Sequence, residues 1–89
     1  MSDSPAVTFY WRPGCYFCIN LERQLSQEGL ELTKRNIWED PASAAFVRSV
    51  ANGNETVPTV VVGSTSMVNP SPAQVLAALR QEAGQVQPE

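Results

Sequence analysis

Two cysteines separated by two residues, Cys15 and Cys18, constrain this chain more than any other feature. They follow a proline–glycine turn, where an alternating β-prone run at 7–11 ends and helical spacing begins. Residues three apart in a helix share a face, so the two sulfurs are placed to close a disulfide. Cys15 also stands at the predicted helix N-terminus, where unpaired backbone N–H groups favour a thiolate. The stretch predicts a thiol–disulfide active site, with an exposed Cys15 as nucleophile and a deeper Cys18 as resolving thiol.

The length of 89 residues predicts one domain, 1–89, with its core at about 6–84. A net charge of −3 without a basic cluster argues against nucleic acid as a partner. The N-terminal residues have neither the basic end nor the apolar centre of a signal peptide, and no apolar run approaches the ~20 residues that span a membrane. We therefore expect a cytoplasmic protein with no membrane partner.

The absence of histidine narrows the chemistry of the two cysteines. It removes Cys-His hydrolases and Cys-His zinc sites, so a zinc ion would need four thiolates from two chains. We expect no bound metal and a monomer. One alternative of a different class remains open, a non-enzymatic dimer that holds zinc or an iron–sulfur cluster through Cys15 and Cys18.

The hydrophobic spacing and the turn residues predict the element order β-α-β-α-β-β-α. Asp40 is expected to cap the second helix, and Ser71 and Gln74 form a capping box for the third. The predicted strands are 7–11, 30–38, 56–63 and 66–68, and the predicted helices begin at Cys15, Pro41 and Pro72 and end at Gly29, at the turn 52–54 and at Gly84. The side chains expected to face the core are Cys18, Ile19, Leu21 and Leu25 in the first helix, Ala42, Phe46, Val47 and Val50 in the second, and Val75, Leu76 and Leu79 in the third.

This order predicts an α/β fold. A strand–helix–strand unit pairs its strands in parallel through a right-handed crossover, and the last two strands form an antiparallel hairpin. Both faces of the first strand carry bulky side chains, which is typical of a central strand covered on each side. We therefore expect a mixed four-stranded sheet flanked by three helices.

Four segments, 15–18, 46–54, 56–60 and 69–71, together resemble the thioredoxin superfamily and, by total length, its glutaredoxin branch. The likeness is greatest to the mycoredoxins, which are actinobacterial glutaredoxin-like proteins. It implies a thioredoxin fold and the reduction of mixed disulfides between proteins and a low-molecular-weight thiol. Mycothiol, or glutathione, would be the reducing co-substrate, and no cofactor would be bound. The resemblance also implies a cis Val57–Pro58 bond, which would leave the backbone of Val57 free to pair with a substrate chain beside Cys15.

A thiol-binding groove is expected around the cysteines, although each of its residues also has a simpler structural role. Tyr16 and Phe17 stand where many glutaredoxins have proline and tyrosine. The turn 69–72 replaces the glycine-and-acid motif that opens the last helix in many glutaredoxins, and its Pro72 lacks an N–H for a ligand carboxylate. That loss suits mycothiol, which has no free carboxylate. The expected groove residues are Arg12, Tyr16, Phe17, Thr56, Val57, Pro58, Asn69 and Ser71.

A second redox alternative differs only in the source of electrons. The chain could be a redoxin recharged by thioredoxin reductase rather than by a mycothiol system. Redoxins of that group usually carry a tryptophan-rich segment near the last helix, and residues 64–75 contain neither tryptophan nor phenylalanine. The sequence therefore favours the mycothiol system and leaves the thioredoxin reductase route as the alternative.

Overall fold

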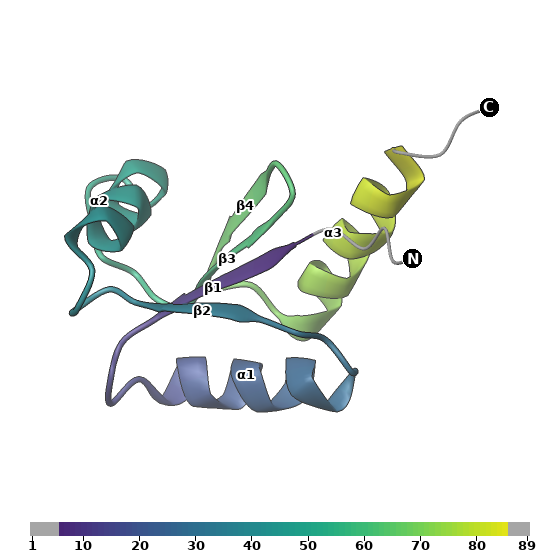
Figure 1. The fold of residues 1–89 in the computed structure, drawn as a ribbon, viewed down its shortest axis with the longest axis horizontal. Helices are drawn as coiled ribbons and strands as arrows, with labels where there is room; N and C mark the ends of the chain where they lie inside the picture. The colour runs from purple at the N-terminus through teal and green to yellow at the C-terminus, as the bar shows by residue number, and fades with distance from the viewer. Residues whose placement is uncertain (1–5, 86–89) are drawn as a thin grey trace.

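The computed structural model describes residues 6–85, which form seven elements in the expected order (Figure 1). The two ends of the predicted domain, 1–5 and 86–89, lie outside the described residues. The elements are β1 (Val7–Trp11), α1 (Tyr16–Gln27), β2 (Thr33–Asn36), α2 (Pro41–Val50), β3 (Thr59–Val62), β4 (Thr65–Val68) and α3 (Pro72–Gln85).

The four strands form one mixed sheet in the order β2-β1-β3-β4. β1 pairs in parallel with β2 and antiparallel with β3, and β3 pairs antiparallel with β4. In this register Phe9 lies opposite Lys34 on one side and Val60 on the other. The predicted thioredoxin fold, with its mixed sheet and central first strand, is confirmed.

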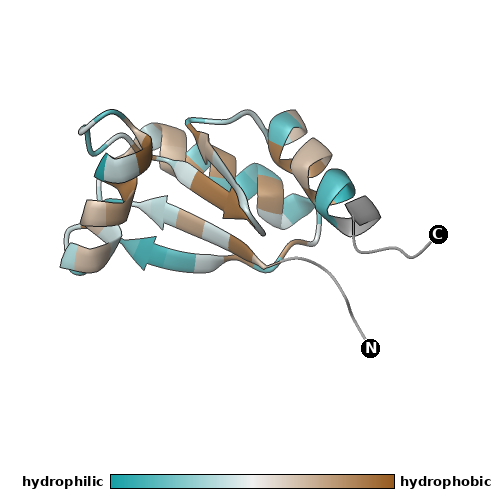
Figure 2. Cartoon of the chain, turned by 90° about the horizontal axis from the view of Figure 1, so that it is seen from above, coloured by the Kyte–Doolittle hydropathy of each residue, from teal (hydrophilic) through white to brown (hydrophobic). Residues whose placement is uncertain are grey.

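The two faces of β1 contribute to two separate hydrophobic clusters. Val7 and Phe9 pack with side chains of β3, α1 and α3, whereas Tyr10 points to α2 and stacks on Phe46 with ring centroids 5.0 Å apart. Figure 2 shows hydrophobic residues concentrated on the inner strands, while β2 at the edge is largely hydrophilic. The larger cluster contains the buried residues Val7, Phe9, Cys15, Cys18, Leu21, Leu25, Val60, Val62, Val75 and Ala78.

The helices begin at or next to the residues that the sequence predicted, whereas α3 continues to Gln85, one residue past its predicted end at Gly84. The backbone N–H of Ser71 donates to the side chain of Gln74 at 2.8 Å, and the Gln74 N–H donates back to the Ser71 hydroxyl at 3.2 Å. At the start of α2, Asp40 occupies the predicted N-cap position, but its side chain makes no cap hydrogen bond to the backbone. The Asp40 carboxylate instead accepts from the Ser43 hydroxyl, which is the main reason why the pKa of Asp40 is lowered. Gly29 follows α1 with a φ of +81°, a conformation that costs glycine little.

Two predicted strands are longer than the observed ones. Leu30 and Leu32 precede β2 and pack against the larger cluster without pairing in the sheet. β3 begins at Thr59 rather than at residue 56, since Pro58 has no N–H to donate to a neighbouring strand. The segment 56–58 is therefore a loop, and it runs beside the cysteines.

The predicted inward faces of the helices were wrong at several positions. Ile19 is 50% exposed, because it lies about 100° around α1 from Cys18 and away from the stripe that Leu21 and Leu25 complete. In α2, Ser43 and Ala44 are buried in place of Ala42, which is exposed. In α3 the fully covered positions are Val75 and Ala78, whereas Leu76 and Leu79 are half-buried.

The end of α3 is fastened to the β3–β4 hairpin. One carboxylate oxygen of Glu82 accepts hydrogen bonds from the hydroxyls of Ser64 and Thr65, each at 3.1 Å. None of the helices in residues 6–85 combines the length and the apolar character that crossing a bilayer requires.

The burial pattern of α1 predicts different costs for two truncations. Leu25→Ala should lower the free energy of unfolding by about 2–5 kcal/mol, because its fully buried side chain leaves a cavity. Ile19→Ala should change it by less than about 1 kcal/mol, because that side chain is already half in solvent. Urea denaturation of the oxidised protein measures both, and equal losses would contradict this placement of α1.

Candidate active site

Cys15 occupies the N-cap of α1, between a tight turn and the first helical residue. Gly14 has a φ of +77°, which turns the chain after Pro13, and Cys15 itself is extended at φ −96° and ψ 104°. The Cys15 sulfur accepts a hydrogen bond from the backbone N–H of Cys18 at 3.1 Å. A cysteine sulfur thus takes the place of the oxygen of a usual N-cap side chain, at the positive end of the helix.

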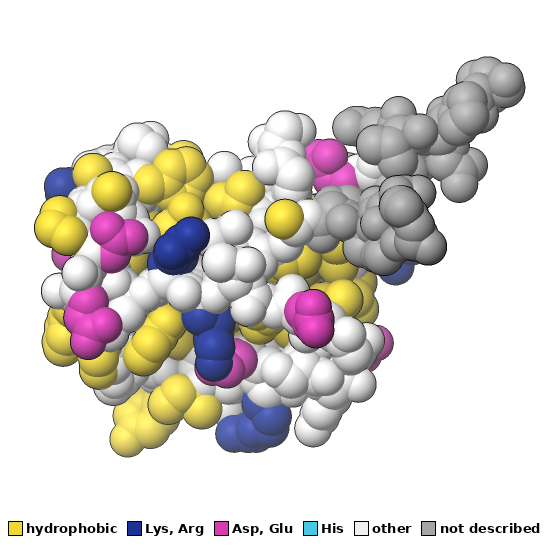
Figure 3. All heavy atoms as spheres, in the orientation of Figure 1, with side chains coloured by type: hydrophobic (Ala, Val, Ile, Leu, Met, Phe, Trp, Pro, Cys, Tyr) yellow, Lys and Arg dark blue, Asp and Glu magenta, His cyan; other side chains and the backbone are white. Residues whose placement is uncertain are grey.

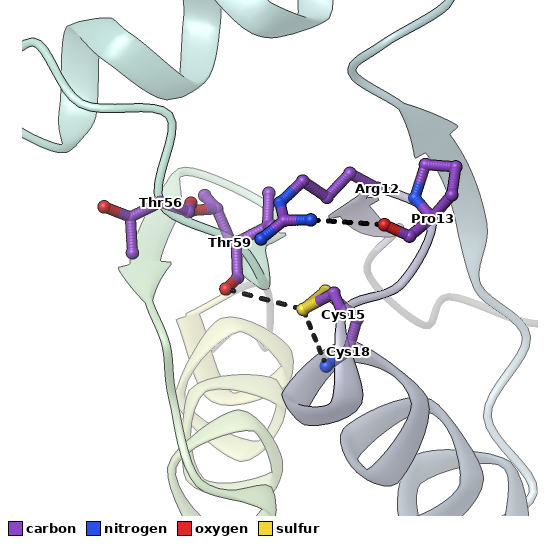
Figure 4. The surroundings of a disulfide bond; sticks show 7 residues. Arg12, Pro13, Cys15, Cys18, Thr56 and Thr59 are labelled. Carbon is purple, nitrogen blue, oxygen red and sulfur yellow. Dashed lines mark hydrogen bonds between the residues drawn. A yellow bond between two sulfur atoms is a disulfide. The ribbon is translucent and has the colours of Figure 1, made fainter.

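Cys15 and Cys18 are joined by a disulfide bond across one helical turn (Figure 4). Their Cα atoms are 5.2 Å apart, within the range that a disulfide spans. Cys15 is only 6% exposed and Cys18 2% exposed. The expectation of an exposed Cys15 was therefore wrong, because Cys15 packs in the larger cluster together with Cys18, although Cys18 is the deeper of the two.

Val57 lies directly against the sulfur of Cys15. Its carbonyl oxygen is 3.8 Å from the Cys15 Sγ, and its bond to Pro58 is cis, as the resemblance implied. Val57 is half-buried and packs against both hydrophobic clusters. No hydrogen bond to its backbone N–H is found in the described part of the chain, 6–85. One edge of the disulfide therefore faces backbone groups from a loop 42 residues away in sequence.

Other predicted groove residues belong to this loop or are hydrogen-bonded to it. The Thr59 hydroxyl donates to the carbonyl of Thr56 at 2.8 Å, and the carbonyl of the buried Pro58 accepts from the N–H of Asn69 at 2.7 Å. Ser71 is exposed, and both its N–H and its hydroxyl take part in the cap of α3. Thr56, Val57, Pro58 and Asn69 thus form one connected wall, whereas Ser71 serves the helix.

Three more predicted groove residues, Arg12, Tyr16 and Phe17, are close to Cys15 in the chain. Tyr16 and Phe17 are 80% and 70% exposed, so neither ring contributes to the core. Figure 4 shows Arg12 extending across the site from the end of β1. One guanidinium nitrogen of Arg12 donates to the carbonyl of Pro13 at 3.2 Å, and the guanidinium carbon lies 5.5 Å from the centre of the Trp38 ring.

Trp38 is the neighbour of the site that the sequence did not reveal. Residues 30–38 were expected to form a strand, with no role for this tryptophan. The parallel register places Asn36 opposite Trp11, and the Ile37 N–H donates to the Trp11 carbonyl at 2.9 Å, which brings Trp38 beside Arg12. The closeness of Trp38 and Arg12 follows only from this strand register, and no local spacing in the sequence predicts it.

The chemical capacity of the site is thiol–disulfide exchange. A sulfur at a helix N-terminus that accepts an N–H is stabilised as a thiolate once the disulfide is reduced. Within the residues that the structure describes, no three histidine, cysteine or acidic side chains lie together as a metal site.

Comparison with known protein families shows to which family this chain belongs. The sequence model of the glutaredoxin family matches residues 7–67. The chain belongs to the glutaredoxin family. It is 36% identical over 80 residues to a protein of Mycobacterium tuberculosis assigned as a glutaredoxin, and this match covers 89% of the chain and 95% of that protein. The chain is accordingly a glutaredoxin-like thiol–disulfide oxidoreductase with the Cys15–Cys18 pair.

Solved structures agree with this glutaredoxin in fold. The glutaredoxin-like NrdH-redoxin of Escherichia coli superposes with a TM-score of 0.68 at 23% identity and covers 94% of this chain and 97% of its own. A glutaredoxin of Archaeoglobus fulgidus gives a TM-score of 0.69 at 23% identity, with 86% and 87% covered. Members of the family act on thiols and disulfides, with a thiol as co-substrate and no bound cofactor.

The geometry of the N-cap predicts two separate thiol titrations in the reduced protein. The pKa of Cys15 should lie below the ~8.5 of a free thiol, since the Cys18 N–H and the helix N-terminus stabilise its thiolate. Cys18 should titrate later, because burial disfavours its charged form. Thiolate absorbance against pH should show an early and a late step, with only the late step left in Cys15→Ser. Two steps near the free-thiol value would contradict the role of the helix end.

Proposed function

We propose that this glutaredoxin reduces mixed disulfides between proteins and a low-molecular-weight thiol, with Cys15 as nucleophile and Cys18 as resolving thiol. One observation carries the proposal: Cys15 is the less buried member of a disulfide closed at a helix N-terminus. Thiol–disulfide exchange needs a stabilised thiolate that can reach substrate and a second thiol within bonding distance.

The first step transfers the small thiol to the enzyme. The Cys15 thiolate attacks the sulfur of the small thiol in the mixed disulfide, and the S–S bond to the protein substrate breaks. The substrate leaves as a thiolate and takes up a proton. Cys15 is then joined to the small thiol in a new disulfide, and no net electrons have entered the system.

Two routes resolve this intermediate. A second small thiol can attack its own kind on Cys15, which releases the small-thiol disulfide and restores the Cys15 thiolate. Alternatively, Cys18 attacks the sulfur of Cys15 and expels the small thiol, and the product is the Cys15–Cys18 disulfide seen here. Two further small thiols then reduce that disulfide, and a reductase upstream returns the oxidised small thiol to its reduced form.

The backbone of Val57 offers a docking edge for the protein substrate. Its carbonyl lies 3.8 Å from the Cys15 sulfur, and its N–H has no partner within residues 6–85. An extended substrate segment could pair with these groups in the manner of an added β-strand, which would hold its disulfide against Cys15. Arg12, Tyr16, Phe17, Thr56, Pro58 and Asn69 would frame that segment or the small thiol.

Two observations favour mycothiol as the small thiol. The relative with 36% identity comes from Mycobacterium tuberculosis, an actinobacterium, and the sequence resembles the actinobacterial mycoredoxins. The start of α3 carries Pro72 and a Ser71 N–H already bound to Gln74, so this helix end has few donors left for a ligand carboxylate. Mycothiol has no such carboxylate, whereas glutathione has two. We expect this reaction to take place in the cytoplasm, where thiols are kept reduced.

A coupled assay distinguishes the possible sources of electrons. NADPH oxidation is followed with a protein mixed disulfide as substrate and with the mycothiol, glutathione or thioredoxin reductase system in parallel. The mycothiol system should give the highest kcat/KM. Turnover only with thioredoxin reductase would instead identify a thioredoxin-type redoxin, and a coloured or zinc-containing protein without turnover would identify a metal-binding dimer.

Two cysteine variants test the mechanism. Cys15→Ser should reduce turnover to background with every substrate, because the nucleophile is lost. Cys18→Ser should keep substantial activity on the small-thiol mixed disulfide, since the second thiol comes from solution, and should accumulate the small thiol on Cys15. On a disulfide within a protein it should lose at least about 100-fold, because internal attack gains from proximity. Loss of both activities in Cys18→Ser would reject the proposed route.

A further inference from the structure

Trp38 and Arg12 form a contact at the end of the sheet where the disulfide lies. The guanidinium carbon of Arg12 is 5.5 Å from the centre of the indole ring. Arg12 also donates to the Pro13 carbonyl at 3.2 Å, and the backbone N–H of Trp38 donates to the Asn36 side chain at 2.9 Å, which holds the main chain of this turn. The face of the indole therefore lies within cation–π range of the guanidinium.

Core packing does not account for this tryptophan. Trp38 is 62% exposed and belongs to neither hydrophobic cluster of the described residues. Figure 3 shows hydrophobic side chains exposed at the end of the molecule where Figure 1 places the β1–α1 loop. A large apolar ring that is mostly exposed gains little from burial. The ring of Trp38 instead lies against Arg12, which precedes Cys15 by three residues.

The charge of Arg12 is not neutralised by a carboxylate. In the described ranges the ion pairs are Lys34–Glu22 and Arg48–Glu55, and neither involves Arg12. A guanidinium that stacks on a ring keeps its full charge, whereas one paired with a carboxylate has its field largely cancelled. The contact with Trp38 thus holds an uncompensated positive charge beside the site.

We infer that Trp38 is a positioning residue, which holds Arg12 where its charge stabilises the thiolate of Cys15. This inference rests on the proposed role of Cys15 as nucleophile. Without the ring, Arg12 would keep its charge but would spread over many rotamers in solvent, and its average interaction with the sulfur would fall. Trp38 would touch neither substrate nor sulfur and would act only through Arg12.

Of the four carboxylates on the elements around the site, three have partners of their own, and the fourth, Glu39, has none among the described residues. The Asp40 carboxylate accepts from Ser43, and Glu22 and Glu55 are held in the two ion pairs. Glu39, exposed and next to Trp38, is the carboxylate that could attract Arg12 in place of the ring. The charged side chains on the elements around the site are Glu22 and Arg23 in α1, Lys34 and Arg35 in β2, Glu39 and Asp40 before α2, and Glu55 before β3.

The test is the thiolate titration of reduced full-length protein in a Cys18→Ser background, in which only Cys15 titrates as a thiol. Arg12→Gln should raise the pKa of Cys15 by about 0.5, the size expected for the loss of one nearby charge in a solvent-exposed site. Trp38→Leu should raise it by most of that amount, and Trp38→Phe, which keeps a π-face, by clearly less. The double variant Arg12→Gln/Trp38→Leu should rise no further than Arg12→Gln alone.

Matched controls distinguish an effect of the position of Arg12 from an effect of net charge or of misfolding. Arg23→Gln removes the same charge further along α1, and Glu39→Gln removes the competing carboxylate. Neither should raise the pKa of Cys15 as Arg12→Gln does. Trp38 is exposed, so each variant should keep the circular dichroism of the parent, and the Phe variant keeps the comparison available if the Leu variant fails to fold.

Three results would overturn the inference. The first is an unchanged pKa in Trp38→Leu beside a raised pKa in Arg12→Gln, and the second is full additivity in the double variant. The third is an unchanged pKa in Arg12→Gln. Because the titration needs no substrate, it is independent of turnover: an inactive parent protein would reject the proposed function, while the pKa comparison would still decide the role of Trp38.

Discussion

The hydrogen bond from the Cys18 N–H to the Cys15 sulfur is the interaction on which the rest of the site depends. It fixes the sulfur at the point where β1 has ended and α1 begins, so both cysteines share one face of the helix. The antiparallel pairing of β1 with β3 then brings the loop 56–58 beside that point, and the parallel pairing with β2 brings Trp38 to the other side. The loop 56–58 and Trp38 therefore lie beside the start of α1 because of the order in which the strands pair.

The redox pair is also part of the hydrophobic core. Cys15 and Cys18 belong to the same cluster as Phe9, Leu21 and Val60, and Val57 packs against that cluster and the one under α2. A thiolate formed on Cys15 would therefore carry charge in a nearly buried place, which is costly without compensation. The helix N-terminus and the Cys18 amide supply that compensation locally. The same residues therefore serve both the packing of the core and the chemistry of the site.

The sequence was sufficient for the order of elements, the sheet and the capping box, because each depends on local spacing or on strong turn residues. Asp40-Pro41 and Ser71-Pro72 mark helix starts through backbone chemistry that tertiary packing does not alter. The face of a helix is harder to predict, since Ile19 and Leu21 are equally apolar and only packing against β1 and α3 separates them. Trp38 could not be predicted as a neighbour of Arg12, because their approach follows from the register of two strands that are distant in sequence.

Two backbone groups at the Cys15 sulfur favour opposite protonation states once the disulfide is reduced. A neutral thiol could donate to the Val57 carbonyl, which lies 3.8 Å from the sulfur, whereas a thiolate accepts from the Cys18 N–H at 3.1 Å. The second contact is shorter and becomes charge-assisted when the proton leaves, so it outweighs the first. The carbonyl still limits how far the thiolate is favoured, which leaves room for a third group to adjust the balance. Arg12 has a positive charge, a contact with the Trp38 ring and no carboxylate partner among the described residues, and it is therefore the group suited to that adjustment.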